Sequence, residues 1–144
     1  MCTLKTRMVF FGLVGTLVLG GCGGPGPGGV DLVPVQAPNN PTLCERDQAG
    51  NLLLYVKNQG TAEASSSAVE VQFMNVSPGY SPKVRAQGVT GPLQAGATST
   101  SVISAAIPEG CFNPDCDFEI TVDIVNEVQE TNEQNNSIQG ACVG

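Results

Sequence analysis

The side chains best suited to chemistry are six cysteines, and the chain contains no histidine. Without histidine there is no Ser-His-Asp or Cys-His nucleophilic site and no histidine-containing metal site. Paired carboxylates could still support glycoside hydrolysis, but most acidic residues fall in loops or at outward strand positions, and a domain of about 110 residues has little room for a deep cleft. We therefore expect no enzyme and no cofactor.

Cys22 follows a segment with the properties of a secretory signal. Lys5 and Arg7 precede an uncharged run of about 12 residues, 8–19, which is shorter than the roughly 20 residues that span a bilayer. The order Leu19-Gly20-Gly21-Cys22 resembles the lipobox of bacterial lipoproteins. The resemblance implies a signal peptide at residues 1–21, a lipidated Cys22 as the new N-terminus, and a glycine- and proline-rich tether at residues 22–30; the alternative is an ordinary signal peptide.

Lipidation at Cys22 implies a bilayer as one partner and the bacterial cell envelope as the location. Gly23 rather than Asp follows the cysteine. By resemblance to Gram-negative lipoproteins, this predicts an outer-membrane anchor, with the protein either periplasmic or exposed at the surface.

Four cysteines remain for the folded part, because Cys2 would be lost with the signal; they are Cys44, Cys111, Cys116 and Cys142. In an oxidising compartment they predict two disulfides, for which three connectivities exist. A zinc site would need all four thiolates, but Cys44 and Cys142 are isolated rather than paired as in zinc knuckles. We therefore expect disulfides and no metal at these positions.

The processed chain is strongly acidic. After loss of the signal, four basic residues stand against 13 acidic ones, a net charge of −9, and no basic residue follows Arg85. Such a surface excludes nucleic acid as a partner. Carboxylate and amide oxygens are dense at residues 126–136, where Ca²⁺ ligands could come from Glu127, Glu130, Asn132 and Glu133. The spacing is not that of an EF-hand, and such side chains also close turns, so an architectural role is favoured.

Short alternating patterns, separated by turn residues, predict strands and no helix after the signal. The expected strands are 31–36, 51–57, 68–74, a weak edge strand around Val84, 98–107, 118–125 and a last one around Ile138. Pro34 marks the first as an edge strand. Seven short strands predict an all-β domain over residues 31–144, an antiparallel β-sandwich.

Several segments resemble the CARDB domain, the cell-adhesion-related domain found in bacteria. They are Val56–Ala62, Leu93–Gly96, Ile107-Pro108 and the block FEITVDIVNEVQETNEQNNSI at residues 118–138. The resemblance covers about residues 31–142 and implies a seven-stranded sandwich of fibronectin type III or immunoglobulin-like shape. It implies adhesion or spacing and no catalytic activity.

That implied topology places all four cysteines at one end of the sandwich, with the N-terminus of the domain at the opposite end. It favours the pairs Cys44–Cys111 and Cys116–Cys142, which close the longer loops. The second choice is Cys44–Cys142 with Cys111–Cys116.

The function we expect is a membrane-anchored, non-catalytic adhesion or protein-binding module with a protein or polysaccharide ligand. The alternatives are a passive envelope spacer and an accessory subunit of an envelope complex. A binding module should expose an apolar or aromatic patch, for which the sequence offers Tyr55, Met74, Tyr80 and Phe112.

Overall fold

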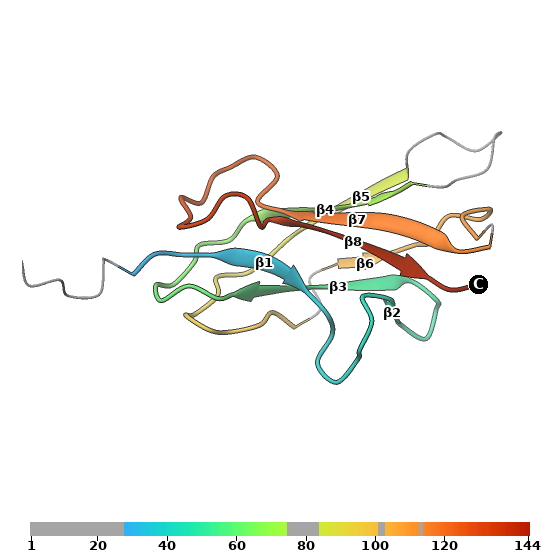
Figure 1. Ribbon diagram of the computed structural model, residues 1–144, viewed down its shortest axis with the longest axis horizontal. Helices are drawn as coiled ribbons and strands as arrows, with labels where there is room; N and C mark the ends of the chain where they lie inside the picture. The colour runs from blue at the N-terminus through green and yellow to red at the C-terminus, as the bar shows by residue number, and fades with distance from the viewer. Residues whose placement is uncertain (1–27, 75–83, 101–102, 113) are drawn as a thin grey trace, which may run out of the picture.

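The computed structural model describes residues 28–74, 84–100, 103–112 and 114–144. Cys22, the remainder of the signal and tether up to residue 27, and Tyr80 lie outside these residues. The described chain forms eight strands and no helix, so none of its segments is an apolar helix long enough to cross a membrane. The strands form two antiparallel sheets that pack face to face (Figure 1).

The first sheet is built around β3 (Leu52–Asn58). Leu52 pairs with Arg46 of β2 (Glu45–Arg46) and with Ala105 of β6 (Ile103–Ala105), so these two strands lie on opposite edges of β3. The strand β1 (Leu32–Val35) pairs with the other half of β3. Both edges of this sheet are therefore short and interrupted.

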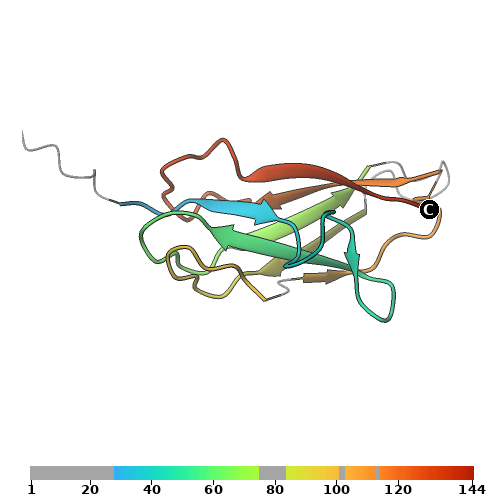
Figure 2. The ribbon, with the colours of Figure 1, turned by 60° about the horizontal axis from the view of Figure 1, so that its bottom comes forward.

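The second sheet has the order β5-β4-β7-β8. Its strands are β5 (Val84–Val89), β4 (Ala68–Phe73), β7 (Cys116–Val122) and β8 (Ser137–Cys142). Figure 2 shows the two layers and places β8 at the border of its sheet. The two sheets together form a fibronectin type III-like sandwich.

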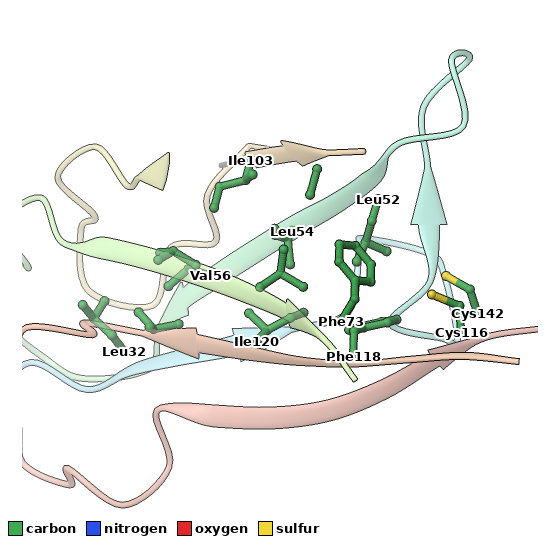
Figure 3. Packing of buried hydrophobic residues seen from close by; sticks show 14 of the residues in the cluster. Leu32, Leu52, Leu54, Val56, Phe73, Ile103, Cys116, Phe118, Ile120 and Cys142 are labelled. Atoms are coloured by element: carbon green, nitrogen blue, oxygen red, sulfur yellow. The ribbon is translucent and has the colours of Figure 1, made fainter. Parts of the chain in front are cut away.

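The core lies between the sheets and follows the alternation in the sequence. Every second residue of β3, β4 and β7 is buried, as period-2 side-chain geometry requires. Phe73 and Phe118 meet edge to face on the side of the core nearest Cys116 and Cys142, with ring centroids 6.4 Å apart (Figure 3). Burial of this face is the main stabilising contribution to the fold.

The predicted antiparallel β-sandwich is confirmed, and a strand lies within or overlaps each expected range, although β6, Ile103–Ala105, is shorter than the expected strand 98–107. The structure adds β2, whose two residues are too short to give a periodic signal. It also ends β7 at Val122 rather than at residue 125. The alternation of residues 118–125, with Phe118 facing inward, predicts that Asp123 faces solvent; this prediction is wrong, because Asp123 has a φ of 49° and is buried.

The two disulfides are Cys44–Cys142 and Cys111–Cys116, with Cα–Cα distances of 5.2 and 4.9 Å. The preferred pairs, Cys44–Cys111 and Cys116–Cys142, are therefore wrong, and the second choice is the one observed. Loop length favoured the first choice, but pairing depends on which Cα atoms lie within bonding reach. The short separation of Cys111 and Cys116 places their Cα atoms 4.9 Å apart, within that reach.

The sandwich has two distinct ends (Figure 1). We call the end carrying all four cysteines the disulfide end, and the end formed by residues 28–31, 58–62 and 126–136 the N-terminal end. At the latter, Thr61 N donates to Gly29 O at 2.9 Å and Thr131 N donates to Val30 O at 2.8 Å. The approach is so close that a Cβ on Gly60 would lie 2.3 Å from Gly29 O. The chain is thus fixed between two loops before β1 begins.

Candidate functional site

The disulfide end joins three segments that are far apart in the sequence. The loop before β2 is bonded to the end of β8 through Cys44 and Cys142, and the turn before β7 is closed by Cys111 and Cys116. Cys111, Cys116 and Cys142 are fully buried, and in Figure 3 Cys116 and Cys142 lie together beside the aromatic core. Covalent links therefore hold the surface residues on these segments at fixed separations.

Arg46 and Phe112 form the centre of this surface. The Arg46 guanidinium carbon lies 5.0 Å from the centroid of the Phe112 ring, a cation–π arrangement. Arg46 Nη2 also donates to Val143 O at 3.2 Å. Phe112 is 37% exposed and Val143 is 77% exposed. We call these three residues the Arg46–Phe112–Val143 patch.

Aromatic and arginine side chains are enriched among the residues that dominate binding energy at protein interfaces. A rigid patch of this composition can bind a protein surface without large ordering costs, because the disulfides already fix it. Of the aromatic and methionine candidates, Phe112 is exposed, whereas Tyr55 and Met74 are half-buried. Sequence reasoning missed Arg46 and Val143, although each lies within two residues of a disulfide cysteine.

A shallow depression lies on the outer face of the second sheet, toward the end that carries Cys116 and Cys142. Its volume is about 420 Å³, and it is lined by Met74, Asp117, Gln139, Gly140 and Ala141. The small residues of β8 leave this space open next to larger side chains of β4 and β7. It is a surface hollow and not an enclosed pocket.

The acidic turn, residues 126–136, lies at the N-terminal end, and several of its side-chain oxygens accept hydrogen bonds from the chain itself. Glu133 Oε1 accepts from Glu130 N at 2.8 Å, and Asn132 Oδ1 accepts from Gln134 N at 3.1 Å. Glu130 accepts from Leu32 N and, at 2.8 Å, from Asn136 Nδ2. These contacts favour the architectural role over Ca²⁺ binding for Glu130, Asn132 and Glu133; Glu127 is exposed.

Within the described ranges, no group of three or more cysteine, aspartate or glutamate side chains is arranged to hold a metal ion. Two buried oxygens of the turn, Asn135 Oδ1 and Asn136 Oδ1, lack a hydrogen-bond partner. Burial is the largest influence on Glu130 and raises the pKa of its carboxyl above the ordinary value.

Asp123 organises the start of this turn, which sequence reasoning missed. Its two carboxylate oxygens accept from Glu127 N at 3.1 Å and from Val128 N at 2.9 Å. Aspartate tolerates the left-handed backbone and commonly caps local N–H groups, so the strand stops there. The spacing of Asp123 and Asn126 was the signal in the sequence that could have indicated this turn. In the structure both residues have a positive φ.

Comparison with known proteins agrees with this geometry. The fold defines an immunoglobulin-like antiparallel β-sandwich domain. The family model CARDB matches residues 29–140, and the chain belongs to the CARDB family. Two disulfides indicate a compartment outside the cytosol.

A solved structure with a similar fold is the solution structure of one domain of a protein named as a cell surface protein from Methanosarcina acetivorans. It has 19% sequence identity and a TM-score of 0.56, covering 79% of this chain and 90% of that domain. At this identity the similarity shows the fold alone. None of the curated proteins searched matches the chain.

Proposed function

We propose that the protein is a membrane-anchored lipoprotein whose CARDB domain is a non-catalytic binding module, attached through Cys22 and binding a partner protein or polysaccharide at the disulfide end. The observation that carries the proposal is the arrangement of the two ends. The chain enters the domain at the N-terminal end, and the Arg46–Phe112–Val143 patch lies at the opposite end.

Anchoring from the N-terminal end directs the disulfide end away from the bilayer. The about eight residues between Cys22 and Val30 can span at most roughly 27 Å, so the domain stays close to the membrane. Hydrogen bonds to Gly29 and Val30 fix the last part of that connection to the fold. The name of the similar domain from Methanosarcina acetivorans supports a surface role of this kind.

Two measurements test the proposal. Replacing Cys22→Ser should move the protein from the detergent phase to the aqueous phase in phase partitioning, and unchanged partitioning would refute anchoring. The purified domain should capture a partner from envelope proteins and polysaccharides, and the Phe112→Ala and Arg46→Ala variants should capture less of it. The matched control is Val89→Ala, because Val89 is 65% exposed on a different part of the surface.

A passive spacer or an accessory subunit is the alternative. A spacer should retain no specific partner with either the wild-type or the Phe112→Ala protein. Capture of the same partner by wild type and by both patch variants would place the binding surface elsewhere.

A further inference from the structure

The outer edge of β8 carries backbone groups that have no hydrogen-bond partner among the described residues. Val122 N donates to Asn136 O at 2.8 Å, which fixes the alternation of the β7–β8 ladder. In an antiparallel pair, every second residue bonds to the neighbouring strand. Residues 138, 140 and 142 therefore face β7 with their backbone groups, while the N–H and C=O groups of Ser137, Gln139 and Ala141 point away from the sheet.

The other described edges carry devices that discourage strand addition. On β1, Pro34 has no N–H, and the outward N–H of Leu32 donates to Glu130. The edge strands β2 and β6 have only two and three residues. The edge strand β5 carries the charged Arg85, paired with Glu70 at 3.1 Å. Short strands, proline, charge and covered N–H groups are the usual protections of sheet edges.

The β8 edge has none of these protections. It is six residues long, it contains no proline, and no charged residue follows Glu133 in the sequence. Two apolar side chains are exposed along it, Ile138 at 36% and Val143 at 77%. A strand of this kind is a template for pairing with another strand.

We propose that β8 pairs antiparallel with β8 of a second copy of this chain, with Gln139 facing Gln139 on the two-fold axis. Two processed chains each carry a net charge of −9 and repel one another, but this edge brings no like charges together. A self-complementary edge suits a two-fold interface, in which the same surface serves both copies.

The side chains fit this register. With Gln139 on the axis, Ile138 of one copy lies opposite Gly140 of the other. Gly140 is covered on the inner face by the Phe118 ring, which would lie 2.8 Å from a Cβ placed there. Because Gly140 carries no side chain, residue 140 does not obstruct the Ile138 of the second copy that lies opposite it. Val143 O already accepts from Arg46, so pairing is confined to residues 137–141, about six backbone hydrogen bonds in all.

The orientation of such a pair has a functional consequence, which rests on the proposed membrane anchor. Antiparallel pairing reverses one domain relative to the other, so their N-terminal ends point in opposite directions. Copies anchored in two facing membranes meet this requirement without strain. The contact is small and therefore weak alone, and many tethered copies on each membrane would strengthen it through multivalency.

Sedimentation of the unlipidated Cys22→Ser chain tests the pairing directly. We expect reversible dimers over about 10 μM to 1 mM. Gln139→Pro, which deletes the outward N–H, and Gln139→Lys, which places two positive charges on the axis, should each abolish them. The matched controls are Gln87→Pro and Gln87→Lys, which alter the corresponding outward position of the β5 edge and should dimerise like wild type.

Gln139→Cys adds a check on register, since cysteines facing each other on the axis should cross-link two copies under oxidation, whereas Gln87→Cys should not. A wild-type chain that stays monomeric, or dimers that survive in both the proline and lysine variants at position 139, would overturn the proposal. These outcomes do not depend on detergent partitioning or on capture through Phe112, so self-pairing and the proposed function fail independently.

Discussion

Cys116 lies directly opposite Cys142 in the β7–β8 ladder, yet the two are bonded to different partners. Cys142 is bonded to Cys44, which directly precedes β2 of the first sheet, and Cys116 is bonded to Cys111 from the turn that leads into β7. One disulfide thus links the two sheets, and the other closes a local turn. The backbone ladder already holds β7 to β8, so neither covalent bond repeats that connection.

The two disulfides should differ in their contribution to stability. Cys44–Cys142 joins residues 98 apart in sequence, and Cys111–Cys116 joins residues 5 apart. In the chain-entropy model, the first lowers the free energy of the folded state relative to the unfolded state by about 4–5 kcal/mol and the second by about 2 kcal/mol. Urea unfolding of the double serine variants measures both losses, and equal losses would contradict the model.

Gly140→Ala should destabilise the fold. The added Cβ would lie 2.8 Å from Phe118 Cζ and 3.0 Å from Leu43 Cβ, so core side chains would have to move. Overpacking of this kind costs about 1–3 kcal/mol. Gly91→Ala is the matched control, because a Cβ there meets nothing within 4 Å. Thermal unfolding of both variants makes the comparison, and a similar change in Tm for the two would refute this account of Gly140.

Glu130→Ala should loosen the attachment of β1. The substitution removes the acceptor for Leu32 N and for Asn136 Nδ2. Loss of a partly buried acceptor costs about 1–3 kcal/mol in the free energy of unfolding. Amide hydrogen exchange should speed up at Leu32 in this variant and not in Glu127→Ala, whose side chain is exposed. Unchanged exchange at Leu32 would show that the N–H is protected by another group.

Protonation of Asp47 should lower the stability of the folded domain in acid. Hydrogen bonds from the Asn51 side chain first, then from Asn51 N and Ser104 Oγ, lower the pKa of Asp47 to about 2 from its ordinary value of 3.8. A depressed pKa gives stability that is fully present above the unfolded value and is lost as pH falls through the folded one. The Tm difference between wild type and Asp47→Asn should therefore be constant above about pH 4 and should shrink from there toward pH 2. A difference that stays constant down to pH 2 would contradict this role.

Much of the fold could be predicted because alternation is a local property. The periodic apolar residues of β3, β4 and β7 identify both the strands and their buried faces. β2 escaped prediction because it exists only through its pairing with Leu52 and Leu53. Asp123 was placed wrongly because a capping contact to Glu127 N and Val128 N overrides the alternation at that point.

The candidate patch could be predicted only in part. An exposed Phe112 follows from its position in a short polar turn between two cysteines. Arg46 and Val143 belong to the same surface because a disulfide draws the first loop to the end of the last strand, and no local pattern carries that information.

The sequence by itself determined the class of this protein: an acidic chain with no histidine, with strands that alternate over about 110 residues and with four of its six cysteines in that part of the chain. Tertiary structure alone decided which cysteines are bonded, which edge of which sheet is left unprotected, and which residues share the disulfide end. The reason is physical, since periodicity is set by neighbours along the chain, whereas pairing and exposure depend on distances between segments that the sheets bring together.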